Sequence, residues 1–79
     1  MDYKESFSTK LLNLRKENDL SLEALGNILG ISNQAVSLLE KGKRSPSFEI
    51  FFAIAEYFNV STDWLLGRTD DSTCKSVKH

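Results

Sequence analysis

The chain has 79 residues, of which 41% are hydrophobic and 27% are charged, and its formal net charge at pH 7 is −1. This length allows one small domain, and the apolar content is too high for an intrinsically disordered chain. No apolar run approaches the ~20 residues of a membrane span, and no secretory signal pattern opens the sequence, so we expect a cytoplasmic protein.

The only cysteine and the only histidine, Cys74 and His79, lie in a polar C-terminal stretch. A single cysteine excludes a disulfide framework. No cluster of histidine, cysteine or carboxylate residues offers the parts of a metal site or a nucleophilic triad. We therefore expect a protein that is not an enzyme and holds no cofactor.

Charge is distributed unevenly along the chain. Residues 32–48 carry three basic residues and one acidic residue, whereas residues 49–71 carry one basic residue and five acidic residues. A molecule with an acidic total can still present one basic face. The charge alone therefore neither favours nor excludes a nucleic-acid partner.

The apolar spacing is helical, and the alternation typical of strands is absent. The first helix is expected over residues 7–18. The second begins after Ser21, a good N-cap, and ends before Gly30, the residue type that adopts the left-handed conformation after a helix.

Three more helices are expected at short intervals. The third follows Ser32 and continues to about Lys41, the fourth spans residues 47–58, and the fifth follows Ser61 and ends at Leu66. The fold class predicted from these elements is all-α.

The predicted helices divide the chain into two parts. Residues 1–69 are expected to form one five-helix domain, and residues 70–79 a polar, flexible tail without apolar periodicity.

Only Gly30, Ile31 and Ser32 separate the second and third helices. A turn this short makes two helices cross at a steep angle, which is the geometry of a helix-turn-helix. Taken alone, the turn fits a DNA-binding module and an ordinary helical hairpin equally well.

The segment SLEALGNILGISNQAVSLLEKGKRSPSFE, residues 21–49, resembles the helix-turn-helix of the Cro/C1-type (XRE-like) repressor family. The resemblance extends to LLNLRKENDLS before it and to FNVSTDWLLG after it, and so covers about residues 7–67. The packing positions of the motif are occupied in order by Gly26, Gly30, Ile31, Val36 and Leu39.

This resemblance implies a compact five-helix, lambda-repressor-like domain whose second helix lies over the DNA backbone and whose third helix enters the major groove. The family's base-reading positions fall on Ser32, Asn33, Gln34, Ser37 and Leu38. Its phosphate-contacting positions fall on Ser21, Leu22, Lys41, Lys43 and Arg44. A structural ion pair between the first and third helices falls on Arg15 and Glu40.

The chemistry of the third helix agrees with this implication. At 100° per residue, Asn33, Gln34 and Ser37 share one side, opposite the apolar residues Ala35 and Leu39. Amide side chains bond bidentately to adenine in the major groove. The alternative is a polar face that only contacts solvent.

Two leucines depart from the family pattern. Leu22 stands where glutamine is common, so a phosphate contact there needs backbone N–H groups or Ser21. Leu38 lies at the border of the polar face, where it either contacts a thymine methyl group or packs at the protein's edge.

The fourth predicted helix is apolar nearly all round. One side is expected to face the core, and its members are Phe48, Phe51, Phe52, Ala55 and Phe58. A helix of this kind is buried on more than one side, which favours a twofold homodimer. The candidate dimer surface is Ile50, Ala53, Tyr57, Trp64 and Leu66, the alternative being a slightly apolar free surface.

These observations predict a sequence-specific transcriptional regulator of double-stranded DNA, a repressor that binds an inverted repeat as a dimer. Two alternatives remain open at this point. One is an antitoxin-type regulator that also binds a protein partner, and the other is a protein-interaction module that has lost DNA binding.

Overall fold

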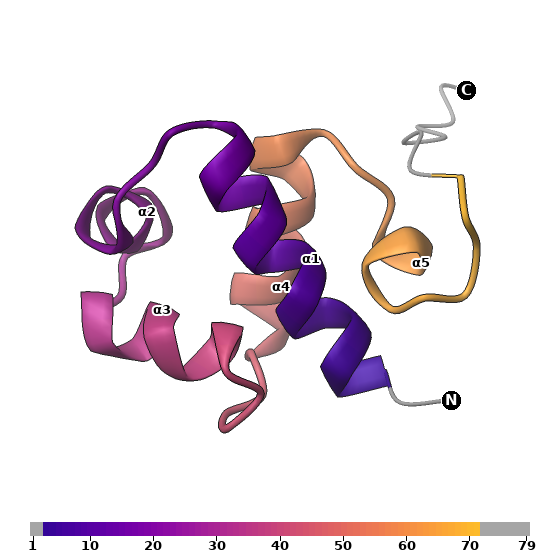
Figure 1. The fold of residues 1–79 in the computed structure, drawn as a ribbon, viewed down its shortest axis with the longest axis horizontal. Helices are drawn as coiled ribbons and strands as arrows, with labels where there is room; N and C mark the ends of the chain where they lie inside the picture. The colour runs from indigo at the N-terminus through magenta and orange to yellow at the C-terminus, as the bar shows by residue number, and fades with distance from the viewer. Residues whose placement is uncertain (1–2, 72–79) are drawn as a thin grey trace.

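The computed structural model describes residues 3–71, which form five helices (Figure 1). The helices are α1 (Tyr3–Glu17), α2 (Leu22–Leu29), α3 (Asn33–Glu40), α4 (Phe48–Phe58) and α5 (Thr62–Leu65). In Figure 1, α1 runs in front of α4, with α2 and α3 on one side and α5 on the other. The predicted all-α, five-helix class is confirmed. No helix in the described part of the chain is long and apolar enough to cross a membrane.

Four of the helices begin after a serine cap. The Oγ atoms of Ser21, Ser32, Ser47 and Ser61 accept hydrogen bonds of 3.0–3.2 Å from the backbone N–H groups three residues further on. Each cap of this kind stabilises a helix by about 1 kcal/mol relative to alanine. The predicted starts of α2, α3 and α5 are confirmed, and α4 begins one residue later than predicted.

The first helix starts at Tyr3, so the predicted start at Phe7 was wrong. The added turn is held by a contact from the far end of the domain, because the hydroxyl of Ser6 donates to the backbone oxygen of Leu65 at 3.2 Å. The hydrophobic pattern of the first helix gives no sign of this long-range contact.

The core lies between α1, α2, α3 and the inner side of α4. Its fully buried side chains are Phe7, Leu11, Leu25, Val36, Ile54 and Leu65. The fifth helix closes the core on one side through Leu65, and the contacts between α2 and α3 form the helix-turn-helix unit.

The orientation predicted for α4 was partly wrong. Phe48 and Phe52 were expected in the core, but their side chains are 82% and 54% exposed. The buried position is instead Ile54, with 0% exposure, and Phe51 packs on Phe7 with ring centroids 5.8 Å apart. Because α4 is apolar nearly all round, its hydrophobic pattern does not select which side turns inward.

Candidate nucleic-acid interface

The turn between α2 and α3 depends on two glycines. Gly30 adopts a left-handed conformation, with φ of 77°, and its N–H donates to the carbonyl oxygen of Gly26. At Gly26 the two helices approach so closely that a Cβ atom would lie 2.6 Å from the backbone oxygen of Ile31. The N–H of Ile31 also donates to Gly26 at 2.9 Å. In Figure 1 α2 is seen end-on and α3 from the side, so the two helices cross steeply, and backbone contacts hold them together.

An ion pair fixes α3 to α1. The Nε atom of Arg15 lies 2.6 Å from Oε2 of Glu40, and its Nη2 donates to Oε1 at 3.1 Å. The remaining guanidinium nitrogen donates to the backbone oxygen of Leu20 at 2.9 Å. Only 14% of the Arg15 side chain and 6% of the Glu40 side chain are exposed. The hydrogen bonds to Glu40 raise the pKa of Arg15 above its ordinary value.

The two sides of α3 differ in burial. Ala35, Val36 and Leu39 are buried in the core. Asn33 and Gln34 are exposed at the start of the helix. The polar side chains predicted to read bases therefore project away from the core, and the packing of α3 does not depend on them.

The other predicted base-reading residues extend this surface. Ser32 is exposed, and its hydroxyl oxygen accepts the capping bond from Ala35. Ser37 is half-buried, and Leu38 is 38% exposed. The structure thus brings all five predicted base-reading residues to the start and outer side of one helix.

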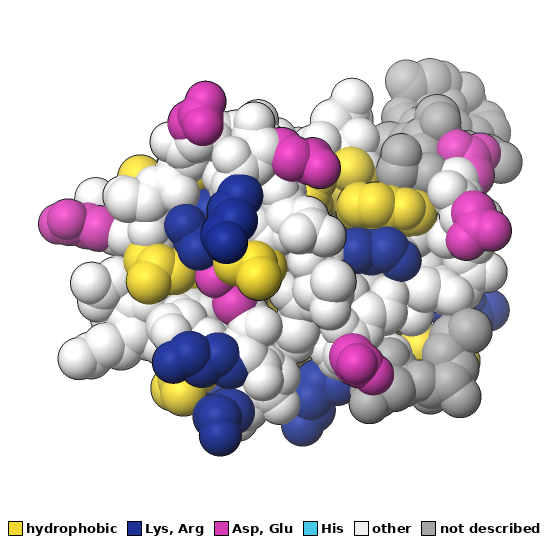
Figure 2. All heavy atoms as spheres, in the orientation of Figure 1, with side chains coloured by type: hydrophobic (Ala, Val, Ile, Leu, Met, Phe, Trp, Pro, Cys, Tyr) yellow, Lys and Arg dark blue, Asp and Glu magenta, His cyan; other side chains and the backbone are white. Residues whose placement is uncertain are grey.

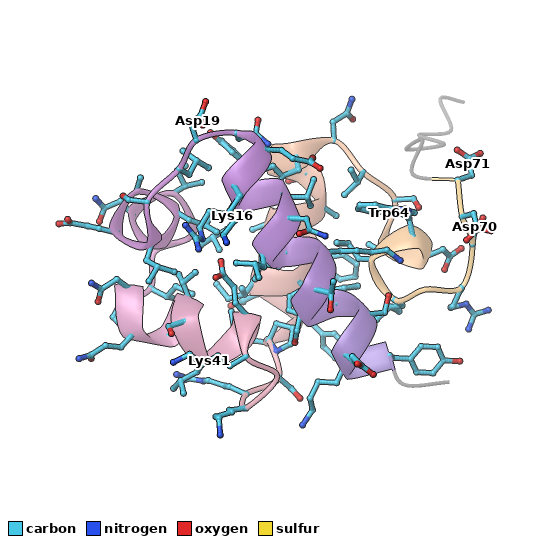
Figure 3. The ribbon with its side chains drawn as sticks, in the orientation of Figure 1. Lys16, Asp19, Lys41, Trp64, Asp70 and Asp71 are labelled. Atoms are coloured by element: carbon cyan, nitrogen blue, oxygen red, sulfur yellow. The ribbon has the colours of Figure 1, made fainter. Side chains whose placement is uncertain are left out.

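The basic loop after α3 is held close to the helix that it follows. Gly42 has a left-handed backbone, with φ of 73°, and the N–H of Lys43 donates back to the carbonyl of Leu38 at 3.0 Å. Lys41, Lys43 and Arg44 are all exposed. Lys41 lies at the end of α3 in Figure 3, and Figure 2 shows basic side chains gathered below that helix. The loop forms a basic edge beside the polar side of α3.

The start of α2 offers backbone donors to an anion. Ser21 is exposed, and its side chain caps the helix. The side chain of Leu22 is half-buried and packs against the core, so it does not extend towards solvent as a glutamine would. The N–H groups of a first helical turn and the helix dipole favour an anion at such an end.

The residues predicted to form a dimer surface lie on α4 and at α5, and they differ in exposure. Tyr57 is 50% exposed, whereas Ile50 and Ala53 are half-buried against the core. Trp64 is half-buried, and the Nζ atom of Lys10 lies 4.9 Å from its ring centroid. Leu66 lines a cavity with Tyr3 and Phe7, while Ile50 lines a different one behind α3. Cys74 and His79, in the predicted tail, lie outside the described residues.

Sequence reasoning missed the exposure of Phe48 and Phe52, whose rings stack with centroids 6.5 Å apart. No signal in the helical pattern separated them from Phe51 and Phe58, the half-buried phenylalanines of the same helix. In the chain they follow the basic loop, in the first two turns of α4.

A steeply crossed helix pair, an exposed polar side on the second helix and a basic loop after it define a helix-turn-helix DNA-binding domain. A family model described as helix-turn-helix matches residues 11–65. The chain therefore belongs to this helix-turn-helix family, the Cro/C1-type family that its motifs resemble.

Known members of the family include transcriptional regulators. The chain is 37% identical over 62 residues to an uncharacterized HTH-type transcriptional regulator of Methanocaldococcus jannaschii, covering 78% of this chain and 94% of that protein. It is 29% identical over 72 residues to RstR, the transcriptional repressor of the cryptic phage CTXphi in Vibrio cholerae, covering 91% of this chain and 65% of RstR. This chain thus spans less than two thirds of the length of RstR.

A solved structure shares the fold. The P22 c2 repressor, crystallised with a synthetic operator, superposes with a TM-score of 0.72 and 30% sequence identity. The match covers 76% of this chain and 91% of that one. The predicted lambda-repressor-like architecture is confirmed. The protein is a transcriptional regulator with a helix-turn-helix DNA-binding domain, from a family of DNA-binding regulators and not a class of enzymes.

Proposed function

We propose that this regulator is a repressor that binds double-stranded DNA as a homodimer, with one α3 in the major groove of each half of an inverted-repeat operator. The observation that carries the proposal is the exposed amide pair Asn33–Gln34 on α3, with a basic loop at the other end of the same helix. Similarity to RstR and to the P22 c2 repressor supports the repressor role. Repression would follow from occupation of a promoter, without a catalytic step.

The exposed residues of α3 would make different kinds of contact with the bases. Asn33 and Gln34 would contact base edges, where each bidentate amide–adenine pair is worth about 1–3 kcal/mol of discrimination. Ser32 and Ser37 would add hydroxyl contacts, and Leu38, exposed at the edge of the polar side, would contact a thymine methyl group. In a twofold dimer the two α3 helices would read half-sites about 34–36 Å apart.

Phosphates would be bound on both sides of α3. Ser21 and the N–H groups at the start of α2, including that of Leu22, would contact one stretch of backbone. Lys41, Lys43 and Arg44 would contact another. The ion pair of Arg15 with Glu40 would hold α3 at the angle that both contacts require.

Selection of bound duplexes from random DNA tests the proposal directly. The expected result is a motif with twofold symmetry, containing adenines at equivalent positions in both halves. Recovery of no enriched sequence, under conditions where the protein is folded, would contradict sequence-specific binding.

Replacing Gln34 or Asn33 by alanine is expected to relax base preference at one position in each half-site. Each change should reduce discrimination at that position by about 2 kcal/mol, because the amide contact is lost while phosphate contacts remain. Competition gel shifts with duplexes substituted one base pair at a time measure the effect. Asn13→Ala, at an exposed position on α1, is the matched control and should leave the preference unchanged. Unchanged preference in Asn33→Ala and Gln34→Ala would exclude these amides from base reading.

The double variant Lys43→Ala/Arg44→Ala is expected to weaken binding to all duplexes alike. Loss of two phosphate contacts per protomer should reduce the slope of log affinity against log salt concentration by about 2 for each protomer bound. Affinities measured between 50 and 200 mM salt give the slope. Arg68→Ala, which removes an exposed arginine paired with Asp63 at 3.5 Å, is the control and should leave the slope unchanged. A loss of sequence preference with an unchanged slope would assign the loop to base reading instead.

A further inference from the structure

A cavity of about 350 Å³ lies between the inner side of α3 and the start of α4. Its apolar walls are formed by Ile31, Ala35, Leu39, Pro46 and Ile50. Because α3 packs chiefly against α1 and α2, the space on its α4 side is left open. The volume lies within the range of about 300–1,000 Å³ that is typical of sites for small molecules.

The cavity changes from apolar to polar between its inner end and its mouth. Ala35 and Leu39 are 8% and 2% exposed, so the inner end reaches the hydrophobic core. Ile50 is half-buried, whereas Arg44 and Ser45 are exposed. A cavity of this kind suits a ligand that has a hydrocarbon body and one polar head.

The charge at the mouth selects the kind of polar head. Arg44 is exposed and has no hydrogen bond or ion pair within residues 3–71. None of the described residues that line the cavity is acidic. A guanidinium group presents paired N–H donors that match the two oxygens of a carboxylate. The complementary head is therefore a carboxylate.

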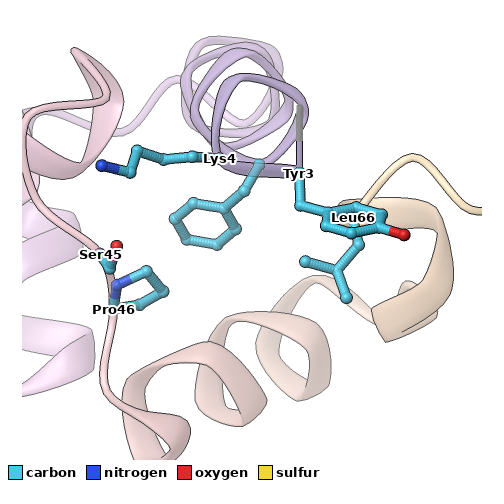
Figure 4. Close-up of a pocket in the computed structure, with 6 residues that line it drawn as sticks. Tyr3, Lys4, Ser45, Pro46 and Leu66 are labelled. Atoms are coloured by element: carbon cyan, nitrogen blue, oxygen red, sulfur yellow. The ribbon is translucent and has the colours of Figure 1, made fainter. Parts of the chain in front are cut away.

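A second cavity is less suited to such a ligand. It measures about 230 Å³, and Figure 4 shows Pro46 on one side of it and Tyr3 and Leu66 on the other. The basic residue in its lining is Lys4, which already has an interaction within the chain, unlike Arg44. The larger cavity therefore offers both more room and an unpaired cation.

We propose that the cavity between α3 and α4 binds a small aliphatic carboxylate, with its hydrocarbon chain against Leu39 and Ile50 and its carboxylate on Arg44. An engineered protein cavity of about 150 Å³ takes up benzene, so a cavity of about 350 Å³ has room for a chain of several carbons. Each methylene group that leaves water strengthens binding by up to about fourfold. The carboxylate fixes the orientation of the chain in the cavity.

The ligand and DNA compete for Arg44. This step rests on the proposed function, in which Arg44 contacts a phosphate of the DNA backbone. A guanidinium group that holds a carboxylate cannot also pair bidentately with a phosphate, and the bound anion repels the backbone. The ligand therefore weakens DNA binding, and by linkage DNA weakens ligand binding by the same factor. The carboxylate acts as an effector that releases the operator.

Sodium octanoate, titrated into the protein without DNA, tests the site. Nuclear Overhauser contacts should join the octanoate chain to the methyl groups of Leu39 and Ile50, and the chemical shifts should change saturably. Octanoate should bind at least tenfold more tightly than butanoate, which has four fewer methylene groups. Contacts with Leu66 would place the ligand in the second cavity and overturn the proposal. Changes that do not saturate would overturn it as well, since they indicate nonspecific association.

Arg44→Gln tests the carboxylate contact, with affinities measured by isothermal titration calorimetry without DNA. The variant should bind octanoate about fivefold more weakly, as expected for the loss of an exposed ion pair. Its affinity for octan-1-ol, which has no charge, should equal that of wild type. Lys43→Gln is the matched control, because Lys43 is the neighbouring exposed cation but does not line the cavity. Equal weakening in Lys43→Gln and Arg44→Gln would overturn the assignment of the carboxylate to Arg44.

Gel shifts on the duplex recovered by selection test the effect on DNA binding. Saturating octanoate should lower the affinity for this duplex at least fivefold. Sodium butanoate at the same concentration supplies the same ionic strength and should not lower it to this extent. An equal effect of the two salts would overturn the effector role.

The titration without DNA separates this proposal from the proposed function. If the protein bound octanoate in the cavity but bound no DNA, the proposed function would fail and the ligand site would stand. If it bound the selected duplex but octanoate made no contact with Leu39 and Ile50, the ligand site would fail and the proposed function would stand.

Discussion

Replacing Glu40 with alanine is expected to destabilise the protein by about 3 kcal/mol, a large fraction of the stability of a domain this small. The change leaves the guanidinium of Arg15 without its carboxylate partner in a site where only 14% of the arginine side chain reaches solvent. Most of the lost stability comes from leaving the charge of Arg15 buried without a partner. The lost attraction between the two charges contributes less. Urea unfolding followed by circular dichroism measures the free energy of unfolding.

The double variant Arg15→Met/Glu40→Leu separates these two contributions. Because it removes both charges, it should be more stable than Glu40→Ala alone, although it lacks the same ion pair. Glu56→Ala, at an exposed glutamate of α4, is the control and should change stability by less than about 0.5 kcal/mol. Equal destabilisation by Glu40→Ala and Glu56→Ala would show that the pair contributes little to the fold.

Replacing Gly26 with alanine is expected to cost about 3 kcal/mol and to abolish specific DNA binding. In an ordinary helix interior the same change stabilises by about 1 kcal/mol, so the expected sign is reversed. The reason is the added Cβ atom, which would lie 2.6 Å from the oxygen of Ile31 and 3.3 Å from the carbonyl carbon of Ser32. Both are backbone atoms, so α2 and α3 must separate to accommodate it.

Gly30→Ala is the matched control for this prediction. Gly30 has φ of 77°, but an added Cβ atom there would meet nothing within 4 Å. The cost is then only that of a left-handed alanine, about 1–2 kcal/mol, and DNA binding should persist at temperatures where the variant is folded. Thermal unfolding and gel shifts on the selected duplex measure both effects. A greater loss of stability in Gly30→Ala than in Gly26→Ala would contradict the close contact at Gly26.

Local features of the fold could be predicted from the sequence because they depend on residues that are neighbours in the chain. A serine cap needs only its own hydroxyl and an N–H three residues away, and the turn needs only Gly30 and the residues beside it. For the same reason the polar side of α3 could be predicted, since Asn33 and Gln34 belong to one helical pattern with the buried Val36.

Features that depend on distant parts of the chain could not be predicted in this way. The first turn of α1 is held by the oxygen of Leu65, which is 59 residues away from Ser6. The rotation of α4, which buries Ile54 and exposes Phe48, goes together with its packing against α2 and α5, elements distant in the chain. Because two sides of α4 are similarly hydrophobic, the sequence pattern does not predict which of them is buried.

The difference in burial between the two sides of α3 has a consequence for how regulators of this kind diversify. Folding depends on the side turned to the core, at Ala35, Val36 and Leu39, whereas Asn33 and Gln34 are exposed. Exposed substitutions usually change stability by no more than about 0.5 kcal/mol. If Asn33 and Gln34 read bases as proposed, a lineage could therefore exchange them for other residues while the scaffold stays folded. Two gene copies could then acquire different target sites through a few surface changes.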